Sequence, residues 1–281
     1  MIEQKTLYIV ATPIGNLQDI TLRAIEVLRH VDLIVAEDTR HSRQLLQQFA
    51  ITTPLQALHQ HNEQAKAEQI LLELQRGRSI ALISDAGTPT ISDPGYRCVQ
   101  AVTQAGLNVK PIPGVCAIIA ALSVAGMPAD KFIFHGFLST RPQQRYQNLQ
   151  LLAQATETIV LYEAPHRVLE LLRTLPTIFG SEREVMIGRE LSKYFESFYR
   201  GTSAEILAHF NAHSDEVCGE FVVCIAGNPT PMKALAIAAD NVLKCLMTEL
   251  PLNKAAKLAA EITGLARNQL YQRGLMLQNV K

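Results

Sequence analysis

The amino-acid sequence predicts an α/β protein with a largely parallel sheet. Short β-rich runs alternate with helical patterns from the N-terminus onward, which is the rhythm of βαβ units. The runs at residues 7–10 and 80–83 are each followed directly by a loop dense in glycine and proline, ATPIGNLQDIT and SDAGTPTISDPG. Sheets of this class bind small molecules where their strands end. The two loops therefore predict a ligand site.

The first part of the chain, residues 1–114, is expected to form an N-terminal α/β domain. A helix over 63–75 closes at Gly77, because glycine readily adopts the left-handed conformation that ends helices. Strands are expected at 7–10, 33–37, 80–83 and 108–112. Three further helices are expected: one over 20–30, one that ends at Gly106, and one that begins at about residue 115.

Residues 115–229 are expected to form a second α/β domain with a mixed sheet. Its expected strands are 132–137, 158–163, 184–188, the aromatic-rich run 193–200, and 220–227. After a turn or linker at 228–231, residues 232–281 read as helical. A helix over 252–262, Gly264 and a helix over 266–277 outline a helix-turn-helix, and a helical hairpin that packs only on its own domain is the alternative.

Composition narrows the class of protein. The chain has 281 residues, with 26 basic and 26 acidic side chains and no net charge, which argues against broad coating of nucleic acid. Positive charge is nevertheless concentrated locally, because residues 131–156 lack any acid and residues 251–281 carry a formal charge of +4. Five cysteines without a CxxC pair indicate a reduced cytoplasmic protein. No apolar stretch is long enough for a signal peptide or a membrane span.

Several familiar kinds of site are absent from the sequence. It contains neither GxGxxG nor GxxxxGK[ST], nor a GxSxG nucleophile elbow. His59 and His61 lack a third metal ligand nearby, so no metal is expected. Either glycine loop alone could be a tight turn, whereas two on neighbouring strand ends favour a site. A third loop, PIPG at 111–114, precedes a helix of small residues that serves either a flat apolar ligand or close helix packing.

Three polar segments also follow expected strands. YEAPHR brings Glu163, His166 and Arg167 to a strand end, where a solvated helix start is the alternative reading. AEDTRHS at 36–42 and RELSK at 189–193 place further acids and bases after other strands.

Taken in order, these segments resemble the tetrapyrrole methylase superfamily, and within it the bacterial ribosomal RNA small subunit methyltransferase I family. TPIGNLQDIT, AEDTRHS, LHQHNE, SDAGTPTISDPG, PIPG, YEAPHR, RELSK, GEFVV and KAAKLAAEITG occur in that family's order over nearly the whole chain. One departure is GFLST at 136–140, where the family commonly has GFLP. The resemblance implies two α/β domains of the tetrapyrrole methylase type with a cofactor cleft between them, and a homodimer.

The resemblance further implies an enzyme that uses S-adenosyl-L-methionine to methylate the ribose 2'-oxygen of a cytidine in small-subunit (16S) ribosomal RNA. The RNA is either free or part of the assembled subunit. Thr88 stands where many relatives carry aspartate. The cofactor-binding residues implied by position are Pro13, Gly15, Ala86, Gly87, Thr88, Ile91, Cys116, Ala117 and Glu163.

The chemistry of this reaction suggests further roles. A ribose hydroxyl is weakly acidic, so a base should assist its attack, and we expect Asp85 and Glu163 to be catalytic, with His166 and Lys193 as the next candidates. We expect local clusters of positive charge to bind the RNA phosphates, because the chain as a whole has no net charge. The expected phosphate contacts, apart from the basic tail, are Arg40, Arg141, Arg145, Arg167 and Lys193, with Arg141 and Arg145 placed on a loop.

Two alternatives remain at this point. A tetrapyrrole or corrin ring methyltransferase would share the fold and the cofactor but would need an apolar trough instead of basic loops. A non-enzymatic nucleic-acid-binding protein would use the helical tail as its reader and would bind no S-adenosylmethionine.

Overall fold

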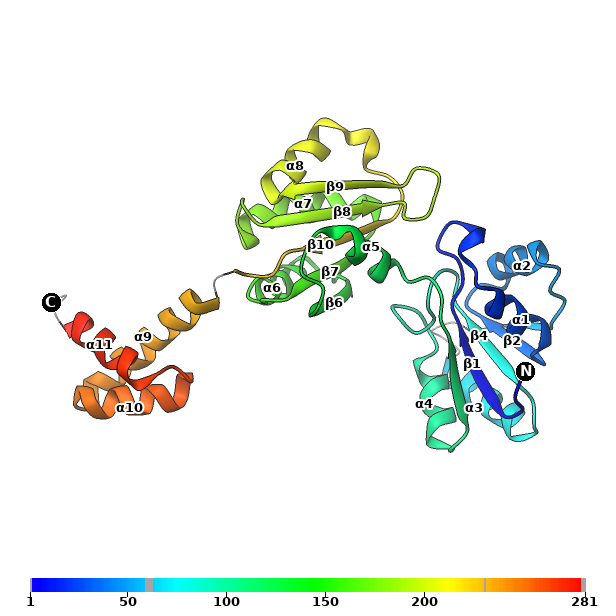
Figure 1. Cartoon of the computed structure of the whole chain (residues 1–281), viewed down its shortest axis with the longest axis horizontal. Helices are drawn as coiled ribbons and strands as arrows, with labels where there is room; N and C mark the ends of the chain where they lie inside the picture. Colours follow the sequence, from blue (N-terminus) through cyan, green and yellow to red (C-terminus); the bar gives the residue numbers. More distant parts are fainter. Residues whose placement is uncertain (1, 59–62, 230, 279–281) are drawn as a thin grey trace. The chain divides into compact units, whose positions relative to one another are not determined.

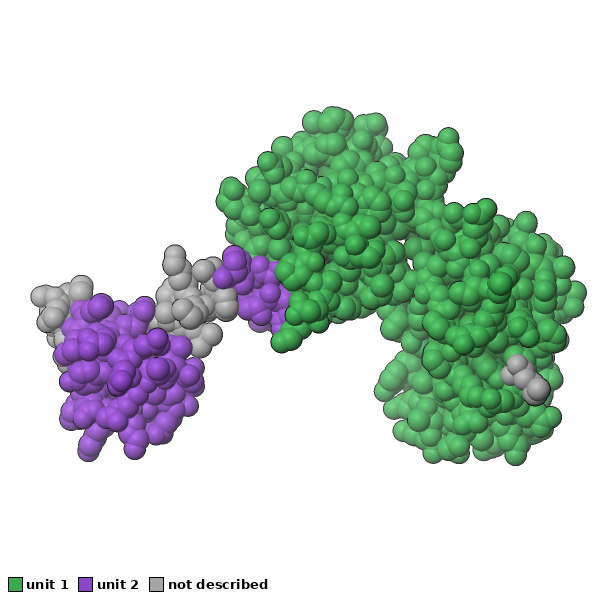
Figure 2. All heavy atoms as spheres, in the orientation of Figure 1, with its two compact units in different colours: residues 1–149, 158–226 green, residues 150–157, 227–281 purple. Residues whose placement is uncertain are grey.

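The computed structural model describes residues 2–58, 63–229 and 231–278. The chain divides into two compact units (Figure 2): the first comprises residues 1–149 and 158–226, and the second comprises 150–157 and 227–281. Unit 1 contains two five-stranded sheets, and unit 2 is mostly helical (Figure 1). The predicted domain boundaries at 114 and 229 stay predictions.

The first sheet is entirely parallel, as the alternation of strands and helices predicted. Its strands follow the order β3-β2-β4-β1-β5. The elements are β1 (Thr6–Val10), η1 (Leu17–Asp19), α1 (Leu22–His30), β2 (Leu33–Ala36), α2 (Thr39–Gln48), β3 (Leu55–Ala57), α3 (Glu63–Gln75), β4 (Ile80–Ile83), α4 (Tyr96–Gln104) and β5 (Asn108–Ile112). Both α2 and β3 were missed in the sequence, because α2 is rich in polar residues and β3 has only three residues.

Both faces of this sheet are buried, which explains the unbroken apolar runs of its central strands. Alternate residues of a strand point to opposite faces. Accordingly, Ile34 and Ile83 pack in the cluster that contains Leu28 of α1, whereas Val35 and Leu82 pack in the cluster of α3 and α4. Strands β1 and β4 are neighbours, so their carboxyl ends lie at one edge.

The second sheet is mixed, which confirms that prediction. Its order is β6-β7-β10-β8-β9, and only the β6–β7 pair is parallel. The elements are α5 (Ala117–Ala125), β6 (Phe132–Phe137), α6 (Pro142–Leu152), β7 (Thr158–Glu163), α7 (Pro165–Phe179), β8 (Glu184–Arg189), β9 (Ser197–Thr202), α8 (Ser203–Ala212), η2 (Ser214–Glu216) and β10 (Phe221–Ile225).

Two expectations about this half were wrong in detail. The strand expected from residue 193 begins at Ser197, because the chain first makes a turn in which Glu190 and Ser192 adopt positive φ. The acid-free segment expected to be a loop instead forms α6, which begins at Pro142. Proline suits the first turn of a helix, where its missing N–H costs nothing.

Unit 2 contains α9 (Pro231–Glu249), α10 (Leu252–Thr263) and α11 (Arg267–Gln278). Leu243 of α9, Ala256 and Ala259 of α10 and Leu270 of α11 share a buried core. Gly264 ends α10 in the left-handed conformation, at φ 70°, as the helix-turn-helix outline requires. In the described part of the chain, every helix is too short or too polar to cross a membrane.

Candidate functional site

The two glycine loops that follow β1 and β4 are bonded to each other. The backbone N–H of Thr12 donates to the Gly87 carbonyl at 2.9 Å, and the Gly87 N–H donates back at 3.0 Å. The Thr12 hydroxyl donates to the Ser84 carbonyl at 3.2 Å. The loops therefore form one rigid wall, as their positions on neighbouring strands predicted.

The loop after β5 joins the same wall at close range. A Cβ atom added to Gly114 would lie 2.9 Å from the Cβ of Ala11, closer than real atoms approach. The Thr88 hydroxyl donates to the Val115 carbonyl at 3.1 Å. Glycine is therefore required at position 114 by the close approach of Ala11 in the first loop, and Thr88 joins the second loop to the third.

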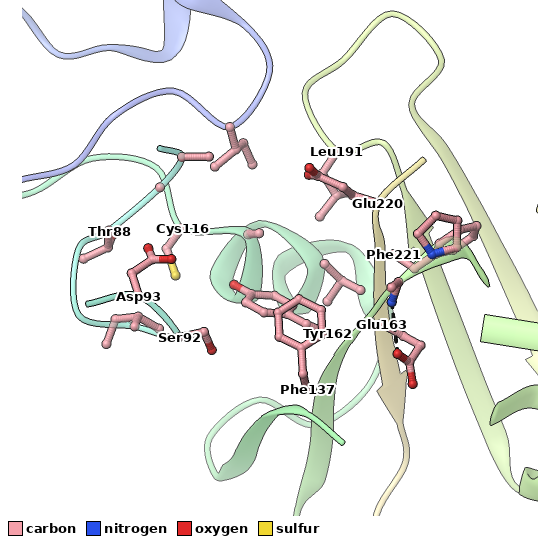
Figure 3. A pocket seen from close by; sticks show the side chains of 18 residues that line it. Thr88, Ser92, Asp93, Cys116, Phe137, Tyr162, Glu163, Leu191, Glu220 and Phe221 are labelled. Atoms are coloured by element: carbon pink, nitrogen blue, oxygen red, sulfur yellow. Dashed lines mark hydrogen bonds between the residues drawn. The ribbon is translucent and has the colours of Figure 1, made fainter. Parts of the chain in front are cut away.

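A pocket of about 310 Å³ opens against this wall (Figure 3), a size at the lower end of the range for small-molecule sites. Both sheets contribute to it, because its lining comes from the loops after β1 and β4 and from the ends of β7 and β10. The lining residues are Ile14, Ala86, Gly87, Thr88, Ile91, Ser92, Asp93, Cys116, Ala117, Phe137, Tyr162, Glu163, Ala164, Pro165, Leu191, Glu220, Phe221 and Val222.

Most of the predicted cofactor residues line this pocket, namely Ala86, Gly87, Thr88, Ile91, Cys116, Ala117 and Glu163. Pro13 and Gly15 do not line it, and Ile14 between them does. Gly15 instead packs against the side chain of Lys193. The first loop therefore presents its apolar residue to the pocket and uses its glycine to admit the turn that follows β8.

The pocket suits a ligand that is both flat and positively charged. Its lining includes no lysine, arginine or histidine, and it does include acidic side chains. Phe137 and Tyr162 offer aromatic faces, with ring centroids 5.6 Å apart. Small residues such as Ala117 at the start of α5 leave room beside them.

Glu163 lines the pocket, as its predicted place beside the cofactor requires, but its surroundings do not suit its predicted role as a base. Its side chain is fully buried, at 0% exposed, and its oxygens lie 3.3 Å from Arg145 and 3.3 Å from Arg167. One oxygen also accepts the Ala164 N–H at 3.0 Å. Two guanidinium groups that face the carboxylate stabilise its charged form, so the geometry argues against Glu163 as the base.

The same ion pairs correct the prediction that Arg145 and Arg167 contact phosphate. Arg145 lies on the inner side of α6 with its side chain 6% exposed, and it also faces Glu170 at 3.5 Å. Arg167 is 15% exposed and donates to the Leu138 carbonyl at 2.7 Å. Both guanidinium groups bind partners inside the protein and have little surface to offer to RNA. One signal for the burial of Arg145 was available in the sequence, because Arg145 lies one helical turn before Leu149, which is buried.

The remaining predicted basic residues lie closer to solvent. Arg141 is exposed, and the side chain of Arg40 is 89% exposed beside Asp38. Lys193 bonds Glu190 at 2.9 Å and Glu220 at 3.2 Å, so its charge is largely compensated. His166 is exposed at the start of α7 and does not line the pocket.

Three acidic side chains, Glu37, Asp85 and Asp93, lie close together at the second glycine loop. Asp85 does not line the pocket; its carboxylate accepts the Asp38 N–H at 2.9 Å. Burial, followed by the carboxylates of Asp93 and Asp85, raises the pKa of Glu37 to about 7. Burial also raises the pKa of Asp93 to about 6, with a contribution from Asp85. Asp93 was missed as a site residue, although it lies within the SDAGTPTISDPG loop.

No group of three potential metal ligands occurs among the residues that the structure describes. His59 and His61, the incomplete metal site of the sequence, lie outside those residues.

Comparison with known proteins identifies the fold. A model of the tetrapyrrole (corrin/porphyrin) methylases matches residues 6–207. The chain belongs to this family. A model of the RsmI C-terminal HTH domain matches residues 233–278, which covers the helices of unit 2. The methyl donor of these methylases, S-adenosylmethionine, is the cofactor of the chain.

Relatives of this methylase cover nearly its whole length. Proteins named ribosomal RNA small subunit methyltransferase I are 50% identical in Pseudomonas aeruginosa, over 97% of this chain and 98% of the relative, and 47% identical in Escherichia coli O157:H7, over 98% and 96%. The chain therefore also belongs to the family of those methyltransferases.

Solved structures share the fold at low sequence identity. A uroporphyrin-III-C-methyltransferase from Thermus thermophilus is 18% identical with a TM-score of 0.56, over 79% of this chain and 94% of that one. A cobalt precorrin-4 methyltransferase is 14% identical with a TM-score of 0.59, over 79% and 95%. These likenesses concern the fold alone.

Proposed function

We propose that the chain transfers the methyl group of S-adenosylmethionine to the ribose 2'-oxygen of a cytidine in 16S ribosomal RNA. The observation that carries this proposal is the 50% identity, over 97% of the chain, to a protein named for methylation of small-subunit ribosomal RNA. We assign the cytidine and its 2'-oxygen because the motifs of the chain resemble those of the ribosomal RNA small subunit methyltransferase I family.

The residues that would hold the cofactor fit its chemistry. Gly87 and its neighbours offer backbone against the pocket, and a site without lysine or arginine does not repel a cation. When bound, S-adenosylmethionine supplies a methyl group that its sulfonium has already activated. The task of the chain is then to align the acceptor and to exclude water. Phe137 and Tyr162 provide apolar surface that helps to exclude water.

The test is a map of 2'-O-methylation on ribosomal RNA from cells that lack the protein. We expect one ribose methyl of 16S ribosomal RNA to disappear and to return when the intact chain is supplied again. Loss of a base methyl instead would refute the 2'-oxygen assignment, and an unchanged map would refute the RNA substrate.

Two exposed arginines, Arg40 and Arg141, are the remaining candidates for phosphate contacts. Replacing both with alanine should weaken RNA binding and reduce the salt slope by roughly one for each arginine that binds a phosphate, because each such arginine releases condensed counterions. Cofactor affinity should not change. Fluorescence anisotropy with a 16S fragment at several salt concentrations measures the slope.

A matched control is Arg76→Ala, which removes another exposed arginine just past the end of α3, on the side of the first sheet where β4 begins. An identical slope in Arg40→Ala/Arg141→Ala and in Arg76→Ala would exclude the two arginines from the RNA surface.

The setting of the reaction belongs to the same proposal. We propose that the enzyme meets its ribosomal RNA substrate in the cytoplasm, either free or in the assembled subunit. The family resemblance supports a homodimer as the working form. The helix-turn-helix outline of α10 and α11, with Lys254 and Lys257 exposed on α10, supports a second contact to RNA. A tetrapyrrole substrate has weaker support, because those neighbours are at most 18% identical.

A further inference from the structure

Three acidic side chains line the pocket, and their surroundings differ. Glu163 is buried between Arg145 and Arg167, and Glu220 pairs with Lys193 at 3.2 Å. Asp93 is half-buried, and the partner that lowers its pKa is the neutral hydroxyl of Ser84. Of the acids described in the lining, Asp93 is therefore the one whose charge no cation compensates.

The backbone around Asp93 is built to present it. Thr90 and Ser92 both adopt positive φ, at 73° and 65°, although neither is glycine. Such conformations cost free energy and persist where the surrounding structure holds them. The chain turns at residues 88–91 and stays bent through residue 94, and Ile91, Ser92 and Asp93 all line the pocket. Figure 3 shows Asp93 and Glu163 on opposite sides of the pocket, with Tyr162 between them.

We propose that Asp93 is the catalytic base that accepts the proton of the acceptor hydroxyl. This inference rests on the proposed function, because only a hydroxyl acceptor has such a proton to give. The oxygen forms a bond to the methyl carbon while the bond from that carbon to sulfur breaks. Sulfur keeps the electron pair and becomes a neutral thioether, and the hydroxyl proton moves to the carboxylate of Asp93.

The surroundings of Asp93 give it the basicity for this step. Burial, together with the Asp85 carboxylate and against the hydrogen bond from Ser84, raises the pKa of Asp93 to about 6. Glu37 and Tyr162 interact with Asp93 directly. Asp38 interacts with Glu37, and Cys116 and Glu220 interact with Tyr162. A general base works best when its pKa lies near the working pH, so an aspartate raised in this way suits neutral conditions better than an ordinary one.

The decisive experiment compares the intact chain with its Asp93→Asn variant. We expect the rate of single-turnover methylation to fall about 100-fold or more, the usual contribution of a positioned base. Calorimetry should find that S-adenosylmethionine still binds, with its affinity lowered far less than the rate, because Asn keeps the shape of the lining and only one of its charges is lost. Asp130→Asn, on an exposed loop away from the pocket, is the matched control and should keep the wild-type rate. An Asp93→Asn variant that is folded and fully active would overturn the proposal.

The pH dependence separates a base from a structural residue. The base acts as the carboxylate, so the rate should rise with pH through about 6 and then level off. Asp85→Asn removes a like charge, lowers the pKa of Asp93, and should move this rise to lower pH. Carbon-13 NMR of the cofactor-free protein should show the same shift in the titration of Asp93, independently of activity.

The remaining outcomes also decide the question. If Glu37→Gln removes the acidic limb while Asp93→Asn keeps it, Glu37 is the base and the proposal is wrong. If the wild-type enzyme methylates RNA on a base instead of a ribose, the proposed function fails first. A normal ribose product with an unaffected Asp93→Asn variant refutes the role of Asp93 alone.

Discussion

Gly87→Val is expected to abolish binding of S-adenosylmethionine. Gly87 has a φ of 79°, a conformation that valine strongly disfavours because its side chain branches at Cβ. A Cβ atom would lie 3.4 Å from the Ile14 side chain and 3.8 Å from the Val115 carbonyl, so the branches of valine would enter the space between the loops. We expect the cofactor affinity to fall at least about 100-fold, which corresponds to about 2.7 kcal/mol. Isothermal titration calorimetry measures it.

Gly106→Val is the control for backbone strain. Gly106 also has a positive φ, at 71°, but nothing lies within 4 Å of its Cβ position, and it sits in the turn between α4 and β5. Both variants should lose stability, and only Gly87→Val should lose the cofactor. Normal affinity in a folded Gly87→Val protein would remove Gly87 from the site.

Arg145→Ala is expected to destabilise unit 1 by about 3–5 kcal/mol, the usual cost of leaving one member of a buried ion pair alone. Its partner Glu163 is 0% exposed, so the carboxylate would lose a compensating charge with little access to water. Arg167 remains at 3.3 Å and should keep the loss toward the lower end of this range. Urea denaturation followed by circular dichroism gives the free energy of unfolding.

Arg141→Ala provides the contrast on the same segment. Arg141 is exposed, so its removal should change stability by no more than about 0.5 kcal/mol. Arg145→Ala combined with Glu163→Gln should recover part of the lost stability, because the buried carboxylate is then neutral. The recovery should be incomplete, because Arg167 loses its ion-pair partner. If Arg145→Ala were as stable as the wild type and bound RNA with a reduced salt slope, the surface role predicted from the sequence would be right.

Local sequence was sufficient for most of the strands and for the loops of the first sheet that line the pocket. Strands such as β4 are buried on both faces, so their residues are continuously apolar and easy to recognise. Glycine is required at position 87 by a positive φ and at position 114 by the close approach of Ala11, and both positions lie at neighbouring strand ends. Turn chemistry and strand order together therefore pointed to one edge of the sheet.

Prediction was weaker for charged side chains. Arg141 and Arg145 are four residues apart in an acid-free segment, yet one is exposed and the other is buried. Arg141 lies just before the first residue of α6, whereas Arg145 lies within the helix, where Glu163 at the end of β7 and Glu170 of α7 are within 3.5 Å of it. Asp85 was predicted as a site residue and Asp93 was not. Only the fold shows that Asp93 lines the pocket and that Asp85 does not.

The sequence by itself determined the α/β class, the parallel first sheet and the mixed second one, the helical extension, and the loops that line one side of the pocket. These features follow from hydrophobic periodicity and from the backbone demands of glycine and proline, which act over a few residues. Only the tertiary structure decided the roles of the charges. It placed Glu163 in a buried ion network, withdrew Arg145 and Arg167 from the surface, and brought Asp93 to the pocket. The effect of a charge depends on burial and on neighbours distant in the chain, and local sequence does not contain that information.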